Sequence, residues 1–320
     1  MIRLAFFIAG IILLIYLILQ LGSHNIFSVI LSLKWNLLWV TLIYSGSELV
    51  RAVALWKSLP EGESQPYLKM LGTRLSGEAI RSLTFTGPFV GEPLKAWLLH
   101  KIGVPTAGAF AAVIIEYLIY TFASAAIGIA GLSYMLAHVE LENDVVLVAR
   151  VIAYSMACFL LVAAIAIIFR IYLIGGIIEG IRKLPHVGKR VPWDRAEIHG
   201  MEELLFKVFR DHPTRFATIL GFDTVAHILL ILELYLIIRW SGIPIGVFQA
   251  FLIEASTKFM ALAFFFIPMQ VGVAEKTYSV VFEALSLPVA IAVAMSLVRR
   301  LRTIVFSAVG LVALTRLTRS

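Results

Sequence analysis

Residues 4–21 read LAFFIAGIILLIYLILQL, a run of 18 residues without a charged side chain. At about 1.5 Å per helical residue, this run approaches the ~30 Å thickness of a bilayer's hydrocarbon core. A signal peptide is the alternative, but residues 21–25 (LGSHN) make a poor cleavage site and further apolar runs follow. The run therefore favours a first membrane span.

The composition points to the same class of protein. Hydrophobic residues make up 60% of the chain and charged residues 15%, whereas soluble domains are about half apolar. The formal charge of +7 is spread over loops and helix ends, which is typical of basic cytoplasmic loops and is no signal for nucleic acid. Cys158 is the only cysteine and the seven histidines lack ligand spacing, so no intramolecular disulfide, metal or cofactor is predicted.

Hydropathy predicts an all-α polytopic protein, a single membrane-embedded domain over 1–320. Its six predicted spans lie at about 4–21, 35–57, 107–135, 146–170, 216–239 and 289–315. Nine Lys or Arg between Arg170 and Arg215 indicate a cytoplasmic segment, and the acidic connection at 136–149 belongs outside. Both termini are then cytoplasmic.

The cytoplasmic linker at about 171–215 contains an amphipathic stretch. Leu204, Leu205, Val208 and Phe209 share one helical face. This stretch is either an interfacial helix on the membrane or a short soluble linker helix.

Two stretches do not fit as simple spans. Residues 67–102 are too polar, and residues 247–287 are apolar but broken at 267–272 (IPMQVG). Each predicts a re-entrant pair of short helices meeting at a Pro/Gly break, which is tolerated at membrane depth only beside protein or a water-filled cavity. A half-helix starting after Gly91, with Pro93 in its first turn, would point free N–H groups at the break and favour a phosphate. Alternatively, Gly91 and Pro93 only shape a cytoplasmic loop.

The order of these features repeats along the chain. Pro88, Gly91 and Glu92 precede Pro105, and Glu116 follows eleven residues later. In the second half the matching series is Pro268, Gly272, Glu275, Pro288 and Arg299. Each half predicts two spans, a broken hairpin and a span, and the halves (1–135 and 146–320) enter the membrane in opposite senses. The sequence therefore predicts an inverted repeat, an architecture that places sites between related halves.

Many ionisable residues lie within the predicted membrane segments, where each costs at least ~2.5–3.5 kcal/mol unless it is paired or hydrated. Arg299, Arg300 and Arg302 are central in the last span, and Glu116 is central in the third. Others lie at Glu48, Arg51, Asp223, His227, Glu233, Glu254 and Lys258. One interpretation is buried ion pairs, for example Glu116 with Arg299. Their number beside two helix breaks favours a polar cavity, although Glu48 with Arg51 alone is structural.

The chain resembles the transmembrane region of lysylphosphatidylglycerol synthases, including stand-alone flippase-like relatives. Residues 88–96 (PFVGEPLKA), continuing through Leu98, Gly103 and Ala111 to Glu116, are similar to the family's P-x-x-G-E-x-x-[RK] run and its following span. Residues 268–275 (PMQVGVAE), continuing to Pro288 and Arg299, are similar to its P-G-G-x-G-x-x-E hairpin and final helix. The chain departs from the pattern at Tyr117 and Tyr120, where E-R-x-x-D is common, and at Met269-Gln270, which replaces a glycine pair.

The resemblance implies an integral protein of the bacterial cytoplasmic membrane that handles lipid and is not an enzyme. The leading hypothesis is a flippase for an anionic phospholipid, glycolipid or polyprenyl-linked lipid. Arg299 would contact the headgroup, Glu116 and Glu275 would pair with basic groups or exchange protons, and Glu92 and Lys95 would gate the first hairpin. Pro88, Gly91, Pro268 and Gly272 would shape the breaks.

Three alternatives remain open. An accessory protein could present lipid to a glycosyltransferase or a terpenoid- or hopanoid-pathway enzyme, docking through the basic linker. An intramembrane transferase could use a buried Glu and Arg, but the sequence shows no nucleophile–base arrangement, metal-ligand set or nucleotide loop. A transporter of a small anion would differ only in cargo.

Overall fold

The protein is an assembly of helices in the computed structural model, which describes residues 31, 33–84, 87–141, 143–173, 175–176, 195–264, 267 and 270–319. Within these ranges no strand occurs. The first half contains α3 (Asn36–Lys57), α4 (Tyr67–Leu83), α5 (Pro88–Lys101) and α6 (Thr106–His138). α7 (Asn143–Ile168), α9 (Arg195–Phe206) and the π-helical turn η2 (Lys207–Asp211) follow, and the second half contains α10 (Pro213–Trp240), α11 (Val247–Ala263), α12 (Val273–Ala284) and α13 (Val289–Arg319).

Prolines set the start of several of these helices. Pro88 and Pro213 occupy the first turn of α5 and α10, where a missing N–H costs nothing. α4, α6 and α13 begin directly after Pro66, Pro105 and Pro288. The predicted helix boundaries at these points agree with the structure to within a few residues.

Four helices are long and apolar enough to cross a membrane: α3, α6, α7 and α10. The predicted span at 289–315 is one continuous helix, α13, but its apolar sequence is interrupted by Arg299, Arg300 and Arg302 and it does not join these four. The predicted span at 4–21 lies outside the described residues. The count of six spans therefore stays a prediction.

Both polar or broken stretches form pairs of short helices, although their re-entrant course stays a prediction. In the first pair, α5 begins at Pro88 after Gly87, whose φ is +50°. The expected start after Gly91 is therefore wrong: Gly91 is inside the helix against α4, and Pro93 lies within α5. In the second pair, Gly272 (φ +80°) precedes α12, while Pro268 lies outside the described residues.

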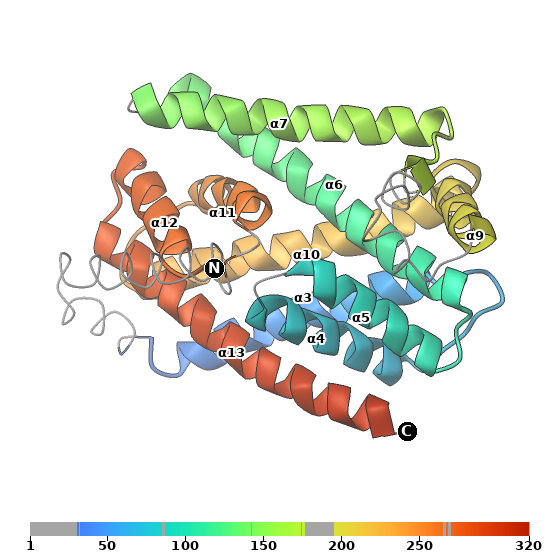
Figure 1. The fold of residues 1–320 in the computed structure, drawn as a ribbon. Helices are drawn as coiled ribbons and strands as arrows, with labels where there is room; N and C mark the ends of the chain where they lie inside the picture. The colour runs from blue at the N-terminus through green and yellow to red at the C-terminus, as the bar shows by residue number, and fades with distance from the viewer. Residues whose placement is uncertain are drawn as a thin grey trace, which may run out of the picture.

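The packing between the halves follows a reciprocal pattern (Figure 1). α3 packs against α10, its counterpart in the repeat. α4 of the first half packs along α13 of the second, and α11 of the second half packs along α6 of the first. The first hairpin helix of each half thus contacts the last helix of the other half. The inverted repeat itself stays a prediction.

Close approach at small residues holds the two reciprocal contacts together. A Cβ added at Gly310 of α13 would collide with the Leu75 carbonyl and the Ala79 side chain of α4. A Cβ at Gly131 of α6 would collide with Ala255 of α11. Small residues of this kind allow helix backbones in membranes to approach closely.

α7 lies on the outside of α6 as a separate layer (Figure 1). It turns large apolar side chains outward, including Leu147, Val151, Tyr154 and Leu161. A helix with such a face is suited to lipid contact. The interior of the protein instead gathers the charged side chains.

Candidate functional site

A first cluster of buried charges surrounds Glu116 on α6. The Glu116 carboxylate is completely buried and accepts hydrogen bonds from Arg51 of α3 at 2.9 Å, Arg74 of α4 at 3.3 Å and Lys95 of α5 at 3.3 Å. Glu116, on the last helix of the first half, is thus surrounded by one basic residue from each of the helices α3, α4 and α5. Such a carboxylate is compensated in the membrane interior.

Further carboxylates balance the bases of this first cluster. Glu48 lies 3.1 Å from the Arg74 guanidinium, and Glu92 pairs with Lys95. Glu48 and Arg51, which the sequence suggested as a structural pair, each take a partner from another helix. Arg74 also lies 3.9 Å from Glu78, so three bases share four acids.

A second cluster surrounds Arg299 on α13. Its guanidinium lies 2.8 Å from Glu254 of α11 and 3.3 Å from Glu233 of α10, and donates a 2.6 Å hydrogen bond to the Tyr278 hydroxyl of α12. Arg302 also pairs with Glu233, and Lys258 lies 2.7 Å from Glu254. The suggested pair of Glu116 with Arg299 is not formed, because each residue belongs to a different cluster.

Glu275 has three partners at the break before α12. It accepts from the Gly272 backbone N–H at 2.7 Å and from the Ser296 hydroxyl at 2.9 Å, and it pairs with Arg300. The first contact caps α12, because a carboxylate here satisfies a free N–H and opposes the positive end of the helix dipole. Glu275 thus joins a helix end to α13.

The two clusters are built on matching positions with opposite charge. Counterparts lie 180 to 183 positions apart in the chain: Glu116 with Arg299, Arg74 with Glu254, Arg51 with Glu233 and Lys95 with Tyr278. In the first half, bases from three helices converge on an acid. In the second half, acids from two helices and a hydroxyl from the third converge on a base. Three of the four matched pairs carry opposite charges, and the fourth matches Lys95 with a tyrosine hydroxyl.

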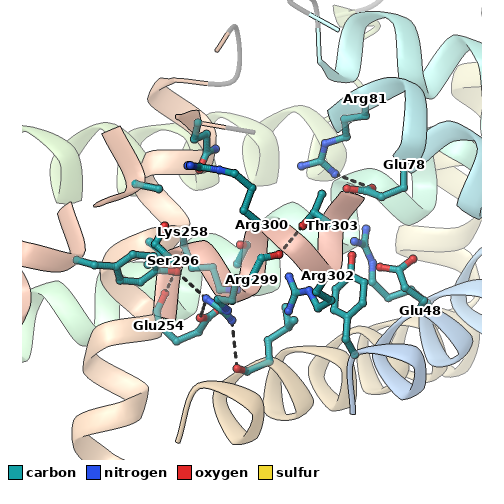
Figure 2. A pocket seen from close by; sticks show the side chains of 18 of the residues that line it. Glu48, Glu78, Arg81, Glu254, Lys258, Ser296, Arg299, Arg300, Arg302 and Thr303 are labelled. Atoms are coloured by element: carbon teal, nitrogen blue, oxygen red, sulfur yellow. Dashed lines mark hydrogen bonds and ion pairs between the residues drawn. The ribbon is translucent and has the colours of Figure 1, made fainter. Parts of the chain in front are cut away.

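A cavity of about 280 Å³ lies between the two clusters. Figure 2 shows Glu48, Glu78 and Arg81 of the first half on one side and Glu254, Lys258 and Ser296 of the second half on the other, with the arginines of α13 between them. Its lining residues come from α3, α4, α6, α10, α11, α12 and α13, together with Gln270 before α12. Both halves therefore build its wall.

The cavity wall is predominantly basic. Six of its lining residues are cationic and three are acidic, namely Arg51, Arg81, Lys258, Arg299, Arg300 and Arg302 against Glu48, Glu78 and Glu254. Glu116, Glu233 and Glu275 pair with these bases but do not line the cavity. A wall of this kind suits an anionic group, which several guanidinium forks can bind.

Unused donor capacity remains on the wall. The Nε groups of Arg51, Arg300 and Arg302 are buried and have no hydrogen-bond partner within the described ranges. Glu78 and Arg81 of the wall are about a quarter exposed, at 25% and 24%. A ligand that reached the Nε groups would gain hydrogen bonds.

Two aromatic residues of the wall contact its arginines. Arg51 lies 3.4 Å from the centre of the Tyr120 ring, and Arg302 lies 3.6 Å from the centre of the Tyr44 ring. Such contacts stabilise and orient guanidinium groups. Sequence reasoning noted Tyr120 only as a departure from a motif and missed Tyr44, since nothing in the sequence marks a partner so distant.

Of the predicted site residues, Arg299 lines the cavity. Lys95, Glu116 and Glu275 lie behind the wall as buried partners, and Glu92 pairs with Lys95. Pro88 and Gly272 lie at the first turn of α5 and before α12, next to the breaks. Sequence analysis named six other charged residues of the wall without placing them in the site, and it noted Glu78 and Arg81 only as part of the polar stretch 67–102. The six are Glu48, Arg51, Glu254, Lys258, Arg300 and Arg302.

The amphipathic stretch of the linker is directed inward. Ile198, Met201 and Leu205 of α9 and Val208 of η2 are buried against α6 and α10. Its apolar face is therefore covered by protein, and the interfacial-helix interpretation is wrong for this face. No group of three metal-binding side chains occurs in the part of the chain that the structure describes.

A family model described as the lysylphosphatidylglycerol synthase TM region matches residues 1–310 of the chain. The match covers both halves, both clusters and the cavity between them. No match is found among curated proteins or among solved structures.

Proposed function

Because the chain belongs to the lysylphosphatidylglycerol synthase transmembrane-region family, we propose that it moves an anionic lipid across the membrane, with the headgroup passing through the cavity between its halves. The observation that carries this proposal is a cavity wall built by both halves, with an excess of basic side chains that comes from α11 and α13. The cargo is an anionic phospholipid, glycolipid or polyprenyl-linked lipid. The headgroup phosphate provides the charge that arginine forks bind.

The size of the cavity fits a headgroup better than a whole lipid. Its volume of about 280 Å³ is close to the lower end of ligand pockets, roughly 300–1,000 Å³. The acyl chains would remain in the bilayer while the headgroup crosses inside the protein. This division avoids placing a charged group in hydrocarbon.

Competition between the lipid phosphate and the carboxylates for the arginines gives a physical reason for the protein to change conformation. Arg299 binds Glu233 and Glu254 in this state, so a phosphate must share or replace those carboxylates. The ion pairs of each cluster join helices of the same half. An entering anion that loosens these pairs permits the helices of that half to shift.

Lys95 links the first hairpin to this cavity. It bridges Glu92 of α5 and Glu116 of α6, and Glu116 also binds Arg51 of the wall. A shift of α5 would therefore reach the cavity through two ion pairs. We place this hairpin and both termini on the cytoplasmic side because of the basic linker at 170–215.

The test is lipid translocation in proteoliposomes, with two variants that act differently. Arg299→Ala removes the central cation, and Ser124→Phe fills the cavity from α6 without removing a charge. We expect either variant to lower the rate at least ten-fold relative to wild type. Arg316→Ala is the matched control, because Arg316 is an exposed arginine on the same helix.

Wild-type rates equal to those of empty liposomes, across anionic phospholipids, glycolipids and polyprenyl phosphates, would refute the proposal. Full activity in Ser124→Phe would exclude this cavity as the path. A parallel uptake assay with labelled inorganic phosphate separates a lipid from a soluble anion as cargo. Mass spectrometry of co-purified lipids then identifies the lipid, with Arg299→Ala expected to lose the enriched species.

The accessory-protein alternative receives less support from the structure. It depended on the basic linker and its amphipathic stretch as a docking element, but the apolar face of α9 is already packed against α6 and α10. A lipid-modifying enzyme would then have to bind through the basic side chains of the linker at about 171–215. A pull-down with and without residues 177–194 would test that binding.

A further inference from the structure

Asp223 and His227 of α10 are completely buried and take no part in the ion pairs of either cluster. They are four positions apart and so lie one helical turn from each other. Both Asp223 carboxylate oxygens lack a hydrogen-bond partner within the described parts of the chain. Both His227 ring nitrogens also lack a partner with good geometry there, although the Tyr120 backbone lies close to the ring.

His227 connects this pair to the cavity. Its ring stacks on Tyr120 with ring centres 4.4 Å apart, and Tyr120 lines the cavity. Tyr120 also carries the contact with Arg51, whose guanidinium binds Glu116. A continuous contact path therefore leads from α10 to the first cluster.

The cations near Asp223 are already occupied. Arg51, Arg74 and Lys95 all exert their charge on Asp223, but each is paired with Glu116. An ionised carboxylate buried without a partner is strongly unfavourable, so such groups become neutral instead. Asp223 is therefore expected to carry a proton in this state.

Charged side chains from several neighbouring helices lie near Asp223 and His227. These are Arg51 of α3, Arg74 of α4, Lys95 of α5, Glu116 of α6, and Glu254 and Lys258 of α11. The charged residues of α13 that contact α10, Arg299 and Arg302, bind Glu233. The charged residues of η2, Lys207, Arg210 and Asp211, are exposed at the start of α10.

We propose that Asp223 is a proton-binding site, with His227 next on the path to the cavity, and that release of this proton accompanies lipid movement. When an anionic headgroup draws Arg51 away from Glu116, the surroundings of Asp223 become more negative and Asp223 holds its proton more firmly. When the headgroup leaves and Arg51 returns to Glu116, this hold weakens and the proton passes by way of His227 to water in the cavity. Coupling to transport rests on the proposed function, whereas the proton site does not.

The proton site is tested by infrared spectroscopy of the protein in lipid at neutral pH. A protonated carboxyl group has a carbonyl stretching band that a carboxylate lacks. We expect wild type to show this band, Asp223→Asn to lose it, and Asp144→Asn, on an exposed residue of α7, to keep it. Labelling aspartate with ¹³C shifts the band in wild type, which identifies an aspartate without any substitution.

An absent band in wild type, or a band insensitive to ¹³C-aspartate, overturns the proton site whether or not lipid moves. The second arm imposes a pH gradient on proteoliposomes. We expect the wild-type translocation rate to change with the gradient, and Asp223→Asn and His227→Gln to translocate without that change. A gradient-independent wild-type rate overturns the coupling, while the infrared result stands by itself. Absence of translocation refutes the proposed function instead.

Discussion

Glu116 on α6 and Arg299 on α13 occupy matching places in the two halves and carry opposite charges. Each is the centre of its cluster, and the partners that surround each carry the charge of the other centre or a hydroxyl. Each cluster is closed by contacts within its own half, and the cavity lies between the two clusters. A charge added in the cavity therefore acts on both networks of ion pairs.

Arg74 is expected to be important for stability. It is completely buried, and its removal leaves Glu48 and Glu116 with fewer cations in the interior. Breaking such a buried network by removing one partner typically costs about 3–5 kcal/mol. Arg74→Met should therefore lower the thermal unfolding temperature markedly. Lys69→Met, on an exposed residue of the same helix, should change it little, and equal effects of both would contradict a role for the cluster.

Gly310 should not tolerate a side chain. Because a Cβ there collides with the backbone of α4, Gly310→Ala should separate α4 from α13 and destabilise the protein, despite alanine's higher helix propensity. At Gly221 of α10 an added Cβ meets nothing within 4 Å, so Gly221→Ala should be neutral or stabilising by up to about 1 kcal/mol. Thermal unfolding of the two variants tests the difference in sign.

Two substitutions should separate the roles of Glu275. Glu275→Gln retains one acceptor oxygen for the Gly272 N–H, while its amide NH2 replaces the oxygen that accepts from Ser296 and the charge that faces Arg300 is lost. Glu275→Ala also loses the helix cap, which is typically worth about 1 kcal/mol. We expect the Ala variant to be the less stable, with faster amide exchange at the start of α12. Equal exchange in both variants would show that the cap contributes nothing.

The ring of Tyr120 should matter more than its hydroxyl. Tyr120→Phe preserves the faces that contact Arg51 and His227, whereas Tyr120→Leu removes both contacts. Cation–π contacts contribute about 0.5–2 kcal/mol depending on their desolvation. Tyr120→Leu should therefore lower both stability and translocation, and Tyr120→Phe should retain both. Loss of activity in the Phe variant alone would instead point to the hydroxyl.

Local sequence signals predicted the helices well because their causes are local. Pro105 and Pro288 mark where α6 and α13 begin, since proline favours a helix start. Gly91 was misleading because glycine marks both chain breaks and close helix contacts. Here it lies within α5, where a Cβ would meet the Gly77 carbonyl and Arg81 of α4.

The partners of the buried charges were harder to predict. Glu48 and Arg51 are neighbours on one helix, but Arg51 binds Glu116 and Glu48 lies beside Arg74. A sequence shows spacing within a helix and not which helices pack together. The packing of α4 and α6 beside α3 within the first half decides these pairs, and no single position indicates it.

The three central arginines of α13 also constrain how the protein is made. A helix with such a centre partitions poorly from the translocon into lipid by itself, because each arginine there costs at least ~2.5–3.5 kcal/mol. Its acidic partners Glu233, Glu254 and Glu275 all precede it in the chain and so leave the ribosome first. We therefore expect α10, α11 and α12 to remain beside the translocon and to assist the membrane integration of α13. Insertion of the last helix then depends on the helices that precede it.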